Sequence, residues 1–371
     1  IQTEKKEIMA LFVGLIGLPN VGKSTLFNAL TGTDVDAENY AFCTVDPNIG
    51  VIDVDDQRLS QLHEKIQPNS CVNSTIKFVD IAGLVKGASQ GEGLGNKFLG
   101  HIREADALIQ VVRCFSGSEI THVEGSVDPV RDVELLQAEL LLADYEMLGA
   151  TLEHLEKVVR SDPNSTQKLE LETIRKAYKM VGEGRMLAEM VLSDEEAVFI
   201  EGQAVLTNKP MMYVANISEG SNIELNEHYK ALSNFVGKDK VFSISALFEK
   251  ELAELNPEDR EVFSEEFNSE DGGVAKLVQV GYALLNLITF YTLANGKLQA
   301  WQIPDGTKAP MAAGRIHTDM EKGFIRAEVA DSADILDLGS LQVLKEDGLL
   351  RVEGKEYVIK DGDVIQFLFK V

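Results

Sequence analysis

A phosphate-loop pattern is the feature that most constrains the fold of this chain. Residues Gly17–Thr25 read G-L-P-N-V-G-K-S-T, which matches the pattern G-x-x-x-x-G-K-S. The apolar run Phe12–Ile16 before it is typical of a buried strand, and the run Thr25–Leu30 after it is typical of a helix. In such a strand–turn–helix unit, backbone N–H groups and the helix N-terminus surround phosphate oxygens. The pattern therefore predicts an α/β domain that binds a nucleotide, and a glycine-rich turn without a ligand is the alternative.

Each residue of the loop has an expected role. Lys23 is expected to reach the β- and γ-phosphates, and the hydroxyl of Ser24 to ligate Mg²⁺. The backbone around them is expected to hold the phosphates. The predicted nucleotide contacts of the loop are Asn20, Val21, Gly22, Lys23, Ser24 and Thr25.

A nucleotide switch also needs a second carboxylate near the metal and a segment that responds to the γ-phosphate. Asp80 ends the expected strand Thr75–Asp80, where its carboxylate can hold Mg²⁺ through water. The N–H group of Gly83, three residues on, can approach the γ-phosphate. Thr44 can supply a second hydroxyl to Mg²⁺ once a triphosphate is bound. We therefore expect Ser24, Thr44 and Asp80 to form the metal site.

The rest of the chain suggests three parts. Apolar segments separated by polar ones predict a mainly parallel sheet, whose expected strands are Phe12–Ile16, Ile49–Val54, Thr75–Asp80, Ala107–Val112, Met211–Asn216 and Val241–Ser245. Residues 129–203 carry apolar positions at helical spacing on both sides of a polar turn, which predicts an antiparallel coiled-coil hairpin. Short alternating runs with Asp-Gly turns follow from about Leu284. The expected domains are residues 9–128 with 204–283, residues 129–203, and residues 284–371.

Composition limits the possible partners and surroundings. The formal net charge of −25 argues against a protein that neutralises many nucleic-acid phosphates, although a local RNA contact is still possible. No apolar segment approaches the roughly 20 residues of a membrane helix, and the polar start Ile1–Ile8 does not resemble a secretory leader. The three cysteines lack metal-ligand spacing. We expect a cytoplasmic protein that does not bind membranes.

The motifs in combination resemble the Obg-related branch of P-loop NTPases and, within it, the YchF-type family. Asn216–Glu219 stands where GTPases carry Asn-Lys-x-Asp, and the helical insertion follows the fourth expected strand. Three C-terminal segments are similar to the TGS module, a ubiquitin-like β-grasp that threonyl-tRNA synthetase also contains: Leu287–Thr292, Gly314–Asp319 and Asp361–Ile365. The resemblance implies a P-loop core with an inserted coiled coil and a C-terminal β-grasp. It also implies ATP as the substrate and the ribosome or its RNA as a partner.

The base-reading segment favours ATP over GTP. In GTPases an aspartate pairs with the N1–H and 2-amino groups of guanine, whereas here Glu219 is one methylene longer and would not fit that edge. Asn216 is expected to contact the base edge. The backbone of Ser245 and Ala246 is expected to flank the ring. A GTP-specific regulatory GTPase remains the alternative.

Hydrolysis is expected to be slow without help. Leu84 follows Asp80–Gly83 where Ras-like enzymes place a glutamine that orients the attacking water, and a leucine can neither donate nor accept a hydrogen bond. The resemblance implies that His122 takes part in hydrolysis, and that Asn20 can coordinate K⁺ in addition to the Mg²⁺ site. A different class of function also remains open: an RNA- or ribosome-binding module in which nucleotide turnover is incidental. The sequence does not indicate the oligomeric state.

Overall fold

The computed structural model describes residues 11–32, 48–81, 94–116, 125–162, 165–256, 258–259, 262–263, 273–339, 348 and 350–370. Backbone contacts divide the chain into two compact units. We call Phe12–Gly50 with Phe78–Lys276 the core unit, and Val51–Lys77 with Leu277–Val371 the C-terminal unit. The sequence did not predict that residues 51–77 pack with the C-terminal part. The three predicted domain boundaries stay a prediction.

A six-stranded sheet with the strand order β2-β4-β1-β5-β6-β7 forms the centre of the core unit, and residues 51–53 of β2 and 75–77 of β4 extend from it into the C-terminal unit. Its strands are β1 (Phe12–Ile16), β2 (Ile49–Asp53), β4 (Thr75–Asp80), β5 (Ala107–Arg113), β6 (Met211–Asn216) and β7 (Val241–Ile244). The pairs β1–β5, β5–β6 and β6–β7 are parallel. Every residue of β1 and β5 is buried, as expected of central strands that are covered on both faces. The predicted mainly parallel sheet is confirmed, and its strand ends agree with the prediction to within one residue.

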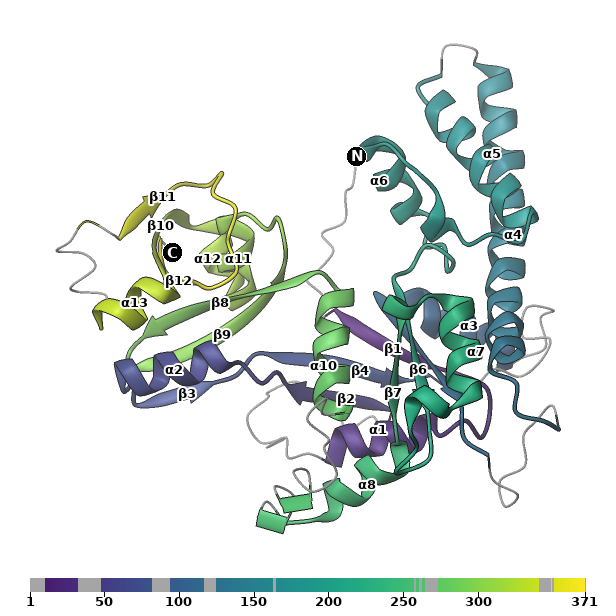
Figure 1. Ribbon diagram of the computed structural model, residues 1–371. Helices are drawn as coiled ribbons and strands as arrows, with labels where there is room; N and C mark the ends of the chain where they lie inside the picture. Colours follow the sequence, from purple (N-terminus) through teal and green to yellow (C-terminus); the bar gives the residue numbers. More distant parts are fainter. Residues whose placement is uncertain are drawn as a thin grey trace. The chain divides into compact units, whose positions relative to one another are not determined.

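Helices follow the strands of this sheet. They are α1 (Lys23–Gly32), α3 (Leu94–Glu104), α7 (Glu227–Val236), α8 (Ala246–Glu254) and α10 (Gly273–Leu284). The helix α1 packs alongside α8 (Figure 1). This pairing brings the segment after β1 next to the segment after β7.

A helical hairpin is inserted between β5 and β6. It consists of α4 (Pro129–Ser161) and α5 (Lys168–Gly182), which lie side by side, and is followed by the 3₁₀ helix η3 (Leu187–Glu189) and α6 (Asp194–Gly202) (Figure 1). Asp128 caps α4 by accepting from the N–H of Arg131, and Pro129 occupies the first turn, where a missing N–H costs nothing. The second helix of the hairpin, α5, is the shorter of the two. The helix ends at Gly182 because Gly184 adopts a left-handed φ of +77°.

The C-terminal unit contains a second six-stranded sheet, in the order β11-β10-β12-β8-β9-β3. Its strands are β3 (Ser70–Val72), β8 (Leu287–Ala294), β9 (Lys297–Pro304), β10 (Phe324–Asp331), β11 (Arg351–Glu353) and β12 (Asp363–Phe369). The hairpin β8–β9 turns at Asn295 and Gly296, which both have positive φ, as a two-residue hairpin turn requires. The strand β12 lies parallel to β8 and antiparallel to β10.

Both faces of this second sheet carry a hydrophobic core. The described helices of the unit are α2 (Gln57–Ile66), α11 (Ala309–Ile316), α12 (Thr318–Lys322) and α13 (Ser332–Leu338), together with residues 277–284 of α10. One core joins strand residues such as Phe290 and Ile365 to Ala312 of α11. The other joins Leu62 of α2 to residues such as Val364. Among the described residues, no helix combines the length and apolar character needed to cross a membrane.

Candidate nucleotide-binding site

The predicted phosphate loop lies between β1 and α1, and its glycines are required by close contacts. Gly22 has a φ of +93°, and a Cβ atom there would lie 2.1 Å from Nδ2 of Asn216. A Cβ atom on Gly17 would lie 2.7 Å from the carbonyl oxygen of Val111. The carbonyl of Gly22 accepts from the N–H of Leu26 at 3.0 Å, so α1 begins directly at the loop. The N-terminal amides of α1 are therefore positioned as in an anion-binding turn.

Lys23, Ser24 and Asp80 converge beside this loop. The ammonium group of Lys23 is paired with Oδ1 of Asp80, and the hydroxyl of Ser24 donates to Oδ2 of the same carboxylate at 3.0 Å. The N–H of Asp80 donates to the carbonyl of Asn48 at 2.8 Å, which fixes the end of β4. Only 8% of the Lys23 side chain and 12% of the Asp80 side chain are exposed. The cation and the carboxylate are thus largely shielded from solvent, which strengthens their electrostatic interaction, whereas Ser24 is exposed.

Asn216 at the end of β6 joins two segments of the site. Its amide nitrogen donates to the carbonyl of Val21 at 2.8 Å, and its amide oxygen accepts from the N–H of Ala246 at 3.0 Å. Only 4% of Asn216 is exposed. The sequence predicted a contact with the base for this residue. It missed that the side chain also holds the phosphate loop to the start of α8.

The other predicted base-side residues lie near these contacts. Ser245 caps α8 by accepting from the N–H of Phe248 at 3.4 Å, and Ala246 is buried. Glu219 is exposed in the turn after Asn216. The parallel order β5–β6–β7 brings the segment after β6 next to the segment after β7.

The remaining loop residues have different surroundings. Val21 is buried, Thr25 is partly buried within α1, and Asn20 is exposed with a left-handed φ of +64°. His101, a histidine that follows Leu84 by 17 positions in the sequence, is exposed on α3. Three predicted site residues lie outside the described residues: Thr44, Gly83 and His122.

The fold and site together define a P-loop nucleoside-triphosphate-binding protein of the GTPase-like type. Residues 12–143 match the MMR_HSR1 family, described as "50S ribosome-binding GTPase". Residues 287–370 match the YchF-GTPase_C family, described as "Protein of unknown function (DUF933)". YchF proteins of two bacteria are 44% and 42% identical to this chain over 98% of its length, so the chain belongs to the YchF family.

The relatives cover almost the whole chain. The ribosome-binding ATPase YchF of Escherichia coli O157:H7 is 44% identical over 365 residues, which are 98% of this chain and 100% of the relative. The ribosome-binding ATPase YchF of Bacillus subtilis is 42% identical over 367 residues, with the same coverage. The solved structure of the Schizosaccharomyces pombe YchF GTPase has a TM-score of 0.85 and 36% identity, and the match covers 97% of this chain and 98% of that one.

Proposed function

We propose that this chain is a Mg²⁺-dependent P-loop ATPase that acts as a nucleotide switch on the ribosome. The convergence of Lys23, Ser24 and Asp80 at the start of α1 carries the proposal. This set supplies one cation for phosphate oxygens together with two kinds of oxygen ligand for a metal ion. The names of the bacterial relatives, which are ribosome-binding ATPases, support the ribosome as the partner.

The donor set fits Mg²⁺, which prefers oxygen ligands and keeps several waters. Ser24 would bind the metal directly, Asp80 would hold it through water, and Thr44 would add a hydroxyl once a triphosphate is bound. When bound, Mg²⁺ neutralises charge on the β- and γ-phosphates. Lys23 would donate to phosphate oxygens, and the N–H of Gly83 would contact the γ-phosphate. Asn20 would also accept K⁺, in keeping with the family resemblance.

We propose that the chain prefers adenine to guanine because of Glu219. Asn216 would contact the base edge with the remaining hydrogen of its amide, and the backbone of Ser245 and Ala246 would flank the ring. The longer side chain of Glu219 would not match guanine as an aspartate does. The bacterial relatives are named ATPases and the Schizosaccharomyces pombe relative is named a GTPase, so the two nucleotides need a direct comparison.

The remaining predictions join this proposal. His122 would assist hydrolysis in place of the glutamine that Leu84 replaces.

The strand order β11-β10-β12-β8-β9, with β12 parallel to β8, supports a ubiquitin-like β-grasp of the TGS type. With the coiled-coil hairpin, the domains would be residues 9–128 with 204–283, 129–203 and 284–371. A ribosome-associated ATPase without a predicted membrane segment would act in the cytoplasm.

Calorimetric titration of the purified, nucleotide-free chain with ATP and then GTP, each with Mg²⁺, tests the proposal. We expect markedly tighter binding of ATP. Lys23→Ala should weaken binding roughly 10- to 150-fold, because charge-assisted hydrogen bonds contribute about 1.5–3 kcal/mol. Unchanged affinity in Lys23→Ala would refute the site.

The variant Glu219→Asp restores the acid found in GTPases and keeps the charge. It should shift the ratio of the two affinities toward GTP by about 10-fold or more. Equal or tighter GTP binding by the wild-type chain would favour a GTPase instead. Co-sedimentation with ribosomes that ignores both nucleotide and Lys23→Ala would favour a binding module with incidental turnover.

A further inference from the structure

The segment between β2 and β4 is an integral part of the C-terminal unit. In α2, Leu59 and Leu62 are 2% and 0% exposed, and they pack in one core with residues of β8, β9 and β12. The strand β3 pairs in parallel with β9, with Cys71 opposite Leu298. Residues 57–72 therefore supply an edge strand and part of a core to a sheet that is otherwise encoded more than 200 residues later.

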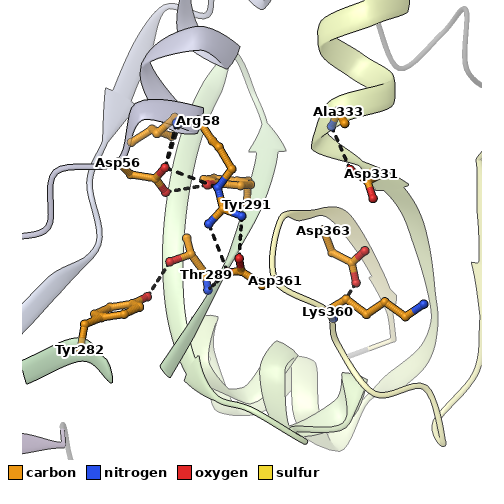
Figure 2. Close-up of polar contacts among 11 residues, drawn as sticks. Asp56, Arg58, Tyr282, Thr289, Tyr291, Asp331, Ala333, Lys360, Asp361 and Asp363 are labelled. Atoms are coloured by element: carbon orange, nitrogen blue, oxygen red, sulfur yellow. Dashed lines mark hydrogen bonds and ion pairs between the residues drawn. The ribbon is translucent and has the colours of Figure 1, made fainter. Parts of the chain in front are cut away.

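A group of polar residues fixes α2 to this sheet. We call Asp56, Arg58, Tyr291 and Asp361 the Arg58 clasp (Figure 2). The guanidinium of Arg58 donates to Asp361 through Nη1 at 2.7 Å and through Nη2 at 3.1 Å. The hydroxyl of Tyr291 donates to Oδ2 of Asp56 at 2.6 Å, and Oδ1 of Asp56 caps α2 by accepting from the N–H of Arg58 at 2.9 Å. Two-pronged arginine–carboxylate pairs hold both partners in one orientation.

The clasp is also tied to the strand interior. Oδ1 of Asp361 accepts from the N–H of Thr289 in β8 at 2.9 Å, and the hydroxyl of Thr289 lies 2.5 Å from that of Tyr282 in α10 (Figure 2). Burial and the bond to Asp56 raise the pKa of Tyr291. Although burial opposes it, the bonds from Arg58 and Thr289 lower the pKa of Asp361. Asp361 therefore stays ionised and Tyr291 stays protonated at neutral pH.

The same segment continues into the nucleotide site through a two-stranded ribbon. At one end of the ribbon, the N–H of Val54 donates to the carbonyl of Ser74 at 2.9 Å. At the other end, the N–H of Asp80 donates to the carbonyl of Asn48 at 2.8 Å. Val54, directly after β2, thus lies opposite Ser74, and Asn48, before β2, lies opposite Asp80 at the end of β4. The strands β2 and β4 therefore run antiparallel. One end of the ribbon therefore leads to the clasp, and the other holds the carboxylate that meets Lys23.

We propose that the β2–β4 ribbon and the Arg58 clasp couple the nucleotide site to the C-terminal unit. A change at Asp80 when nucleotide binds is passed along two hydrogen-bonded strands into α2 and β3, which cannot move independently of the sheet they complete. Because such coupling is reciprocal, a partner bound to the C-terminal unit would change nucleotide affinity in the same degree. The inference rests on the proposed function, since it requires a nucleotide at the phosphate loop.

Hydrogen exchange of the full chain with and without a non-hydrolysable ATP analogue and Mg²⁺ tests this coupling. In the wild-type chain, we expect the analogue to change exchange in β4 and also in β8 and β12. In Arg58→Ala and in Asp361→Ala, affinity and the change in β4 should persist, whereas the change in β8 and β12 should be lost. The variant Arg58→Lys keeps the charge without the two-pronged geometry, so it should show an intermediate loss. If Arg58→Ala unfolds the C-terminal unit, the comparison of Arg58→Lys with the wild-type chain still tests the coupling.

Lys308→Ala is the matched control, because it breaks an exposed ion pair with Glu356 in the same unit. It should respond as the wild-type chain does. A response in β8 and β12 that survives in the Arg58 and Asp361 variants would overturn the coupling, as would an equal loss in the control. Calorimetry on the same samples separates the two hypotheses. Binding of nucleotide with no response in β8 and β12 overturns the coupling alone, and failure to bind ATP or GTP overturns both.

Discussion

At the scale of single residues, Asp144 shows how a buried charge can serve the fold. It lies within α4 and is 0% exposed. Its carboxylate accepts from the N–H groups of Leu206 and Thr207 at 2.8–3.0 Å and from the hydroxyl of Thr207 at 2.6 Å. Burial raises the pKa of Asp144, and these hydrogen bonds oppose the rise. The residue thus satisfies the backbone of the loop that leads into β6.

Replacing Asp144 should therefore destabilise the core unit. In Asp144→Ala, the buried N–H groups of Leu206 and Thr207 lose their acceptor, so the free energy of unfolding should fall by about 2–4 kcal/mol. Asp144→Asn retains one acceptor oxygen and should lose less. Urea unfolding measures both, with Glu153→Ala as a control at an exposed position. Equal stability of Asp144→Ala and the wild-type chain would contradict this role.

Sequence motifs predicted the residues of the phosphate site but not how they support one another. Lys23, Ser24 and Asp80 were predicted to meet because Asp80 ends an expected strand and Lys23 and Ser24 directly precede an expected helix. The bonds from Asn216 to Val21 and Ala246 join residues far apart in sequence, and no local pattern encodes them. The same holds for Arg58 and Asp361, which are 303 positions apart.

At the scale of elements, Glu196 connects α6 to α5. It completes a capping box with Ser193, and its other carboxylate oxygen accepts from the ammonium of Lys176 at 2.8 Å. The bond from Lys176, followed by that from the N–H of Ser193, lowers the pKa of Glu196 to about 2. The folded chain therefore binds this proton more weakly than the unfolded chain does.

This difference predicts a defined dependence on pH. A depressed pKa contributes stability above the ordinary value of about 4.5, and the contribution is lost as the pH falls toward 2. The melting temperature of Glu196→Gln should lie below that of the wild-type chain above pH 4.5, and the gap should close on acidification. Glu153→Gln, which disrupts only an exposed pair with Lys157, is the control. A gap that is independent of pH would exclude the ionised carboxylate as its cause.

Periodicity predicted those elements whose apolar pattern reflects local burial. The strands of the core sheet and the two long helices were found where expected. The short strand β3 and its partner β9 were not expected to pair, because a three-residue strand carries little pattern and its partner lies far along the chain. Hydrophobic periodicity therefore predicts that a helix or strand exists more readily than it predicts which other element pairs with it.

At the scale of the whole molecule, Cys114 can report the opening of the core unit. It is 1% exposed, and burial raises its pKa to about 12, so the thiol is both enclosed and protonated near pH 8. Its N–H donates to the carbonyl of Asn216 at 2.8 Å, which places it in the structure that supports the site. Labelling of this thiol should require the unit to open.

In a Cys43→Ser/Cys71→Ser background, Cys114 is the single remaining thiol. A thiol reagent should label it slowly at pH 8, and ATP at about 100 times its Kd should slow labelling roughly 100-fold by stabilising the folded state. In the same background, Lys23→Ala should reduce this slowing to roughly 2- to 10-fold at the same ATP concentration, because its Kd is expected to be roughly 10- to 150-fold higher. Labelling as fast as in the denatured chain would contradict the enclosure of Cys114.

The discontinuous make-up of the C-terminal unit also bears on how the chain folds during its synthesis. The apolar face of α2 is complete long before its partners exist, because β8 begins roughly 225 residues after Leu62 and β12 begins roughly 300 residues after it. At about 5–20 residues per second, the core around Leu59 and Leu62 can form only ~10–60 s later. During that interval, the nascent chain presents an unpaired apolar helix outside the exit tunnel, where chaperones can bind it.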